Sequence, residues 1–166
     1  MNRRLSLQAG VAAGSLGALL LAGCATPAPT AQGLEPHWSG RLAVQVDGEP
    51  RQSFSAGFDL RGSARAGELE LRGPLGQTVA RLRWNAQGAR LQAPGHGERE
   101  AATLDDLIVQ VVGTSVPVAA LFDWLAGRPT AVDGWRADLS RQSSGRLQAR
   151  REAPPATDLR LVLEQP

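Results

Sequence analysis

The sequence predicts a mainly β domain in which a curved, partly closed antiparallel sheet is covered by two short helices. Three observations indicate this fold. Apolar and polar residues alternate along many short runs from residue 40 onward, turn residues separate the runs, and two segments show a helical period instead. With 166 residues, the chain is long enough for one domain with a substantial core.

Residues 1–23 are predicted to be an export signal. Arg3 and Arg4 are followed by an apolar run over 5–21 and by the sequence LAGC at 21–24. A transmembrane anchor is the alternative interpretation, but the run is shorter than the about 20 residues that a spanning helix needs, and it contains three glycines. The pattern therefore favours an export signal that ends just before Cys24.

Residues 24–36 are predicted to form an extended tether, because they contain three prolines and few core-forming side chains. The folded domain is expected over 37–166. Loss of 1–23 removes two of the 18 basic residues, so the remaining ones equal the 16 acidic residues in number. The mature chain is close to neutral and its arginines do not cluster with aromatic residues, so no nucleic-acid partner is predicted.

Seven short runs are predicted to be strands, because apolar residues occupy every second position in each. The turn sequence DGEP at 47–50 separates the first two runs, and GPLG at 73–76 separates the third from the fourth. In order, the apolar positions are Leu42, Val44 and Val46; Phe54, Ala56, Phe58 and Leu60; Leu69 and Leu71; Ala80, Leu82 and Trp84; Ala89, Leu91 and Ala93; Trp135, Ala137 and Leu139; and Leu159, Leu161 and Leu163.

Two segments are predicted to be short helices that lie against the concave face of the sheet. Thr103 followed by Asp106 resembles a capping box, and the apolar run that it opens stops at Gly113. The second helix is expected to have Pro117 as its first residue and to end at Gly127. If the interior between the helices and the sheet is filled, a structural protein is expected. If it is hollow, a lipid-binding protein is expected.

The residues that carry most enzyme chemistry are absent from the sequence or isolated in it. His37 and His96 are the two histidines and Cys24 is the one cysteine, so neither a metal site nor a disulfide is predicted. Asp105 and Asp106 are interpreted as acidic residues that complement a helix dipole. We therefore predict no cofactor and no enzymatic activity, and a lipid-anchored binding or structural module instead.

Several motifs, taken in order, resemble the LolB family of outer-membrane lipoprotein receptors. They are the lipobox LAGC ending at Cys24, GRLAV at 40–44, FSAGF at 54–58, LELRGPLG at 69–76 and GTSVPVAALFDWLAG at 113–127. The last is the most distinctive, because a glycine, a Val-Pro step and a helix with Leu-x-x-Trp recur together in that family. The lipobox implies that Cys24 becomes the first mature residue and carries a diacylglycerol thioether and an N-acyl chain.

The resemblance implies an unclosed antiparallel β-barrel covered by helices and enclosing an apolar cavity. Such a receptor takes lipoproteins from the LolA-type periplasmic carrier, holds their acyl chains, and releases them into the inner leaflet of the outer membrane without a nucleotide. The resemblance also implies a lipid-anchored monomer that faces the periplasm. Ala25 agrees with an outer-membrane location, because retention in the inner membrane commonly uses Asp at that position.

Ten apolar residues are candidates for the acyl-chain cavity, inferred from the alternation pattern. An inward apolar face is ordinary core in most sheets, so each of them can equally be solidly packed; Trp124 in particular can serve to hold its helix on the sheet. The candidates are Val44, Phe54, Phe58, Leu60, Leu71, Leu82, Trp84, Leu121, Trp124 and Leu125.

Leu75 is the candidate for contact with the membrane. Pro74 suits the second position of a tight turn and Gly76 the fourth, which leaves Leu75 third, with its side chain directed away from the strands. A single exposed leucine is common and requires no function. The resemblance favours a role, because Leu75 matches the protruding loop leucine that the family uses to place its cargo in the membrane.

Two other functions remain open from the sequence. The first is a lipid-anchored structural or assembly factor with a solidly packed barrel. The second is an enzyme that acts on envelope lipids or glycans, which the missing acid and base residues disfavour.

Overall fold

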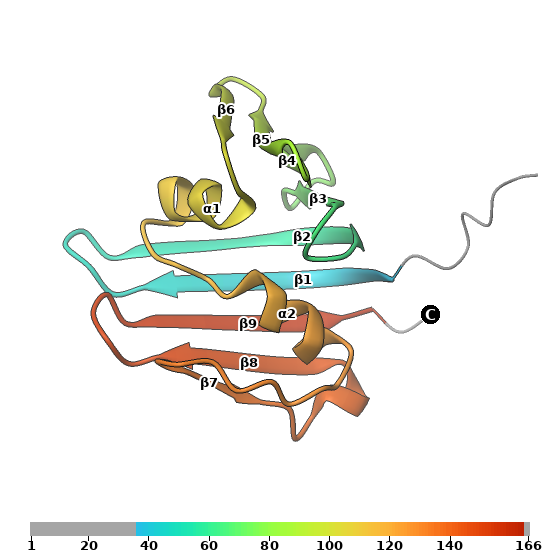
Figure 1. Ribbon diagram of the computed structural model, residues 1–166, viewed down its shortest axis with the longest axis vertical. Coiled ribbons are helices and arrows are strands. Elements are labelled where there is room, and N and C mark those ends of the chain that lie inside the picture. Colours follow the sequence, from blue (N-terminus) through green and yellow to red (C-terminus); the bar gives the residue numbers. More distant parts are fainter. Residues whose placement is uncertain (1–35, 165–166) are drawn as a thin grey trace, which may run out of the picture. The chain divides into compact units, whose positions relative to one another are not determined.

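The computed structural model describes residues 36–164, and in that part nine strands form one antiparallel sheet (Figure 1). The strand order is β6-β5-β4-β3-β2-β1-β9-β8-β7, so β6 and β7 are free edges and the sheet is unclosed. The elements are β1 (His37–Val46), β2 (Gln52–Gly62), β3 (Gly67–Arg72), β4 (Thr78–Asn85), β5 (Gly88–Ala93), β6 (Gly97–Ala101), α1 (Leu104–Val112), α2 (Val118–Leu125), β7 (Trp135–Asp138), the 3₁₀ turn η1 (Gln142–Ser144), β8 (Arg146–Arg151) and β9 (Thr157–Leu163).

The predicted fold class is confirmed, since the structure is mainly β with two short helices and one open antiparallel sheet. The predicted signal peptide at 1–23 lies outside the described residues. So do Cys24 and the tether at 24–36, except for its last residue, Pro36.

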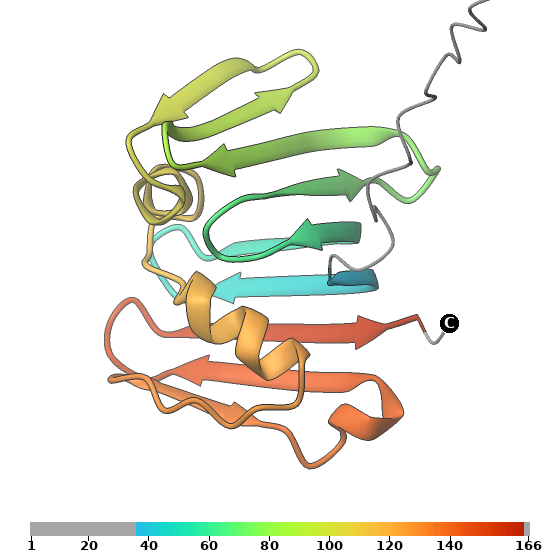
Figure 2. The same cartoon turned by 45° about the vertical axis from the view of Figure 1, so that its right-hand side comes forward.

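The apolar faces of the strands coincide across the sheet and form its concave side. Leu60, Leu69, Leu82 and Leu91 are direct cross-strand partners from β2 to β5. A one-residue slip of any of these strands would turn its leucines to the other face, so the hydrophobic pattern fixes the register. In both ribbon views α2 lies over β1, β9 and β8 (Figures 1 and 2), while α1 contacts β5 and β6.

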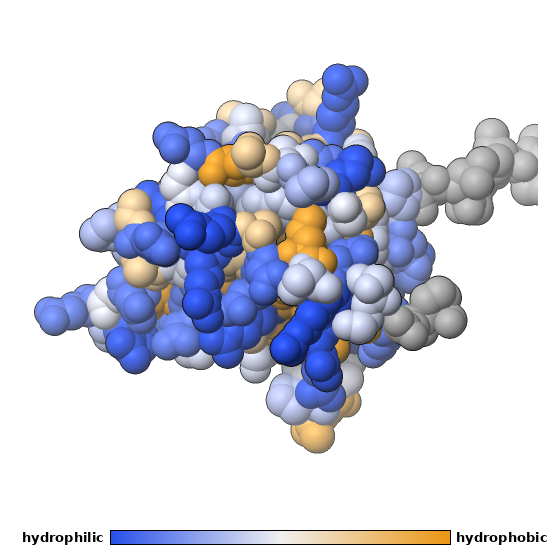
Figure 3. Space-filling view, turned by 90° about the horizontal axis from the view of Figure 1, so that it is seen from below, coloured by the Kyte–Doolittle hydropathy of each residue, from blue (hydrophilic) through white to orange (hydrophobic). Residues whose placement is uncertain are grey.

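The outer face of the sheet is polar and carries cross-strand ion pairs. Glu70 of β3 stands opposite Arg81 of β4, and Glu68 stands opposite Arg83. Opposite charges in direct register favour the same strand alignment as the apolar face does. Viewed from the end of the sheet at β7 and β8, hydrophobic residues form separate spots among hydrophilic ones (Figure 3).

Helix α1 begins and ends where the sequence predicts. The Thr103 hydroxyl accepts a hydrogen bond from the Asp106 backbone N–H at 3.1 Å. At the other end Gly113 has a φ of 77° and its N–H donates to the Val109 carbonyl at 2.9 Å. These two caps satisfy backbone groups that a helix end otherwise leaves without partners.

Helix α2 begins one residue later than predicted. Pro117 is its N-cap rather than its first helical residue, because its ψ of 86° is not helical. Its carbonyl accepts the first intrahelical bond, from the Leu121 N–H at 2.9 Å. Neither α1 nor α2 is long and apolar enough to cross a membrane, and the described residues contain no other helix that is.

Two strands of the sheet, β6 and β8, were not predicted. In β6 four of the five residues are exposed, so no apolar alternation marks it. In β8 the apolar positions are Leu147 and Ala149 alone, yet both are buried. Edge strands are commonly short and charged, as β6 is, and β8 lies next to the other edge strand, β7.

Candidate functional site

Aromatic side chains attach α2 to the concave face. The ring of Phe122 lies 5.7 Å from Trp38 of β1 in an edge-on arrangement and 6.3 Å from Trp84 of β4. Trp124 lies 6.4 Å from Trp135 of β7. Such pairs contribute about 0.5–1.5 kcal/mol beyond the burial of their area. The helix therefore contacts both halves of the sheet through side chains that are far apart in the sequence.

The structure brings nine of the ten cavity candidates together. Six of them are buried members of one core cluster: Phe58, Leu60, Leu82, Trp84, Trp124 and Leu125. Three are partly buried and pack against that cluster: Val44, Leu71 and Leu121. The predicted alternation thus identified residues that share one interior, and in this structure that interior is packed with side chains of the sheet and of both helices.

Phe54 is the candidate that stands outside the cluster. It lies on the same face as Phe58, opposite Val44 of β1, but near the β1–β2 turn, and its side chain is 44% exposed. The residues that precede it in β2, Gln52 and Ser53, are exposed as well. Phe54 therefore exposes apolar surface to solvent, while Val46, on the same face of β1, is buried.

Trp38 and Phe122 belong to the same interior and were not among the predicted candidates. Phe122 is buried and Trp38 packs against the cluster. Trp38 precedes the first glycine of its strand, in phase with Leu42, so its alternation with the later apolar residues was a usable signal. Phe122 could not be separated from its helical neighbours by period alone, because both Leu121 and Trp124 are apolar too.

The β3–β4 turn is the second part of the candidate site. The Gly76 N–H donates to the Gly73 carbonyl at 3.0 Å, which closes a four-residue turn with Pro74 second, Leu75 third and Gly76 fourth. The Leu75 side chain is 92% exposed, far more than any other large apolar residue in the described part of the chain. This turn therefore presents one leucine to the solvent.

Glu70 anchors the base of this turn. Its carboxylate accepts hydrogen bonds from Arg81 at 2.6 Å, from Arg72 at 2.9 Å and from Thr78 at 3.2 Å. The bond from Arg81, followed by that from Arg72, lowers the pKa of Glu70 from its ordinary 4.5 to about 2. The carboxylate is therefore ionised at neutral pH and connects both strands just before the chain turns.

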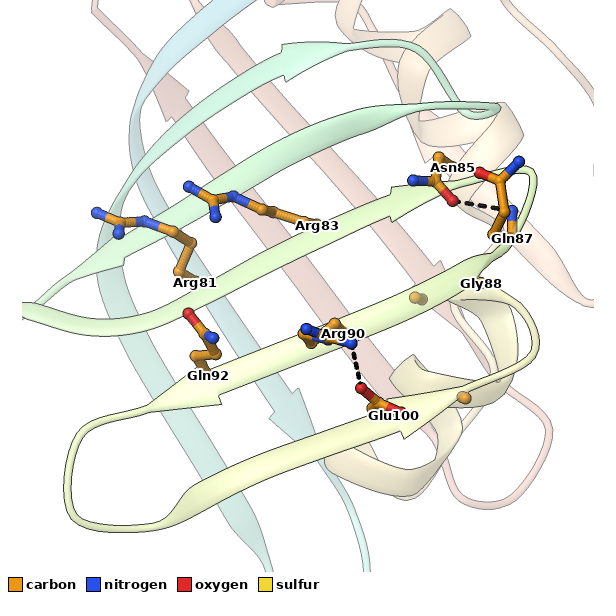
Figure 4. A pocket seen from close by; sticks show the side chains of 10 residues that line it. Arg81, Arg83, Asn85, Gln87, Gly88, Arg90, Gln92 and Glu100 are labelled. Carbon is orange, nitrogen blue, oxygen red and sulfur yellow. Dashed lines mark hydrogen bonds and ion pairs between the residues drawn. The ribbon is translucent and has the colours of Figure 1, made fainter.

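A polar groove of about 420 Å³ lies on the outer face of β4, β5 and β6 (Figure 4). Arg81, Arg83 and Arg90 project into it, and each is paired with acidic residues, as Arg90 is with Glu100. An acyl chain needs an apolar lining, so this groove does not suit one. Within residues 36–164 no group of three acidic, His or Cys side chains is placed to hold a metal ion.

Comparison with known proteins gives the family. The family profile described as "Outer membrane lipoprotein LolB" matches residues 37–157, which span the sheet from β1 to the start of β9, both helices and the Leu75 turn. The chain belongs to the LolB family. The family motifs seen in the sequence at 40–44, 54–58, 69–76 and 113–127 all lie within the matched region.

Three proteins named "Outer-membrane lipoprotein LolB" illustrate the similarity. The protein from Ralstonia nicotianae is 36% identical over 137 residues, which cover 76% of this chain and 65% of that protein. The protein from Cupriavidus pinatubonensis is 35% identical over 155 residues, which cover 88% of this chain and 70% of that protein. The protein from Bordetella petrii is 34% identical over 177 aligned positions, which cover 89% of this chain and 88% of that protein. The match to the first of these spans less than two thirds of its length.

Proposed function

We propose that this protein is an outer-membrane lipoprotein receptor, anchored by lipid on Cys24 and facing the periplasm. It accepts lipoproteins from the soluble carrier LolA and inserts them into the inner leaflet of the outer membrane. The acyl chains of the cargo enter the apolar interior between the sheet and the helices, and the Leu75 turn meets the bilayer. Neither a nucleotide nor a cofactor takes part.

The observation that carries this proposal is the exposure of Leu75 in a chain of this family. A leucine that is 92% exposed at the tip of a turn contributes nothing to the core, whereas the apolar side chains of the sheet pack in one cluster that does not include it. The two features lie on different parts of the domain. This arrangement supports separate roles for the interior in holding cargo and for the turn in delivering it.

The free energies of burial of a leucine and of acyl chains favour the same separation between delivery by the turn and anchoring by lipid. Burial of one leucine contributes about 2 kcal/mol, which is too little to hold a protein on a membrane. Several acyl chains, at about 0.8 kcal/mol per buried CH₂, hold it stably. Leu75 is therefore expected to bias a turn that is already tethered near the bilayer. Transfer of cargo between apolar surroundings avoids the exposure of acyl chains to water.

The Leu75→Glu variant tests the proposal. We expect it to accept a lipoprotein from the carrier nearly as well as the unchanged protein, because Leu75 makes no core contact. Its release of that lipoprotein into lipid vesicles should fall by about tenfold or more, since a charged side chain replaces about 2 kcal/mol of apolar burial. The two steps are measured separately, as loss of cargo from the carrier and appearance of cargo in the vesicles.

Gln87→Glu is the control for this test, because Gln87 is exposed in the β4–β5 turn, at the opposite end of β4 from Leu75. It adds the same charge at an exposed turn that does not carry Leu75 and should change neither step. Equal loss of acceptance and release in Leu75→Glu would mark Leu75 as a residue of the fold or the cavity and would contradict the proposal.

A second candidate function is a lipid-anchored assembly factor with a solid interior. The observation that favours it is the packing of the concave face, where Trp124 and Leu125 are each only 1% exposed. In that case the surface of the domain, rather than its interior, would bind another envelope protein. The two functions differ in whether the interior takes up an acyl chain.

A further inference from the structure

The side chain of Gln77 folds back across the turn that presents Leu75. Its Oε1 accepts a hydrogen bond from the Leu75 backbone N–H at 3.2 Å. Its own backbone carbonyl accepts a bond from the Gly73 N–H at 2.9 Å. Together with the bond from Gly76 to Gly73, these contacts hold both ends and the middle of a turn whose side chains, that of Gln77 included, are exposed.

Gly73 provides the space that this side chain needs. A Cβ placed on Gly73 would lie 2.4 Å from the Gln77 Nε2 and 2.8 Å from its Cδ. The backbone of Gly73 is not in the left-handed region, so its conformation alone does not require glycine. Gly76 is the opposite case, because its φ is +80° and a Cβ there would meet nothing within 4 Å. The two glycines of the turn therefore have different roles.

We propose that Gln77 is a positioning residue for Leu75, seated on Gly73 and holding the Leu75 backbone in the conformation that directs its side chain away from the sheet. The inference rests on the proposed function of Leu75 in the membrane. Ordering one residue of flexible backbone costs free energy of the same order as the burial of one leucine releases. A turn that is ordered before it meets the bilayer does not incur that cost again, so more of the leucine's burial energy is available for insertion.

The test compares full-length lipidated variants in the release of a carrier-delivered lipoprotein into phosphatidylcholine vesicles. Gln77→Ala removes the acceptor, and Gly73→Ala displaces it. Both should lower the release rate about fivefold, the effect of one net hydrogen bond, with cargo acceptance unchanged. Gln77→Glu keeps an acceptor oxygen but adds a charge to the turn that meets the bilayer, so it is compared in the amide exchange of Leu75 and not in release. Gln87→Ala, at the exposed β4–β5 turn, should change nothing.

Hydrogen exchange of the Leu75 amide measures the positioning directly. Exchange should be slow in the unchanged protein and in Gln77→Glu, and faster in Gln77→Ala and Gly73→Ala. Fast exchange in the unchanged protein would overturn the inference, and so would loss of cargo acceptance in Gln77→Ala, which would mark Gln77 as a residue of the fold.

The inference and the function on which it rests fail in different ways. Normal release by Gln77→Ala beside impaired release by Leu75→Glu overturns the positioning role alone. Normal release by Leu75→Glu overturns the proposed function, whatever the amide exchange of Leu75 shows.

Discussion

Glu70 connects strands β3 and β4 by hydrogen bonds at the base of the Leu75 turn. Glu70 lies between Leu69 and Leu71 in β3, so it is on the opposite face of the strand from these two leucines. Its partners across the hairpin depend on how β3 pairs with β4. Arg81 stands directly opposite Glu70, and Thr78 follows the register shift between Leu71 and Arg72. A single extra residue in one strand changes which side chains stand opposite one another.

Glu70→Gln is expected to reduce stability in a way that depends on pH. The folded state lowers the pKa of Glu70 from 4.5 to about 2, so the ionised carboxylate stabilises the folded state at pH values above 4.5. This contribution is lost as the pH falls from 4.5 towards 2. Urea unfolding of both proteins should therefore show a difference in the free energy of unfolding that is constant from pH 7 to 5 and disappears near pH 2.

Glu49→Gln is the control for this measurement, because Glu49 is an exposed residue of the β1–β2 turn and its replacement also removes one negative charge. A difference between the unchanged protein and Glu70→Gln that persists at pH 2 would show that ionised Glu70 is not its source.

The sequence pattern predicts the existence of helix α2, but tertiary contacts set its position on the sheet. Its start near Pro117 and its apolar composition were evident from the sequence. Its place over β1, β9 and β8 depends on Phe122 reaching Trp38 and Trp84. The segment that leads into α2 is also attached, since Arg151 of β8 donates to the hydroxyl of buried Thr114 at 2.7 Å.

Phe122→Ala should detach α2 from its aromatic neighbours. Loss of a buried phenylalanine leaves a cavity and is expected to cost about 3–5 kcal/mol. The free energy of unfolding from urea titration measures the cost, and the tryptophan emission should shift because Trp38 and Trp84 lose a neighbour. Ala119→Ser, on the exposed side of the same helix, should cost far less. A loss below about 1 kcal/mol in Phe122→Ala would contradict the view that this contact holds the helix.

The domain as a whole has an unclosed sheet whose concave face is occupied by the side chains of its own helices. Predicted cavity residues such as Phe58, Trp84 and Trp124 are buried together. Uptake of an acyl chain into this interior therefore requires these side chains to move apart, whereas Phe54 is already exposed. Whether the interior opens decides between the receptor and the assembly factor.

Binding of a fatty acid with an environment-sensitive fluorophore tests the interior. A soluble Cys24→Ala protein without residues 1–23 should bind the probe, and emission should increase as the fluorophore leaves water. An unlabelled fatty acid should displace it, whereas a short-chain acid of the same charge should not. Absence of binding, together with failure to remove a lipoprotein from its carrier, would favour the assembly factor.

Local patterns in the sequence were sufficient for the strand faces, the two helices, the family and the turn position of Leu75. Each depends on residues close together along the chain, where periods of 2 and 3.6 and the capping residues act. Tertiary structure alone decided that β1 pairs with β9, that β6 and β8 are strands, that Glu70 joins Arg81, and that the concave face is filled. These features depend on contacts between residues distant in sequence, and the free energy of such contacts comes from packing that no local pattern encodes.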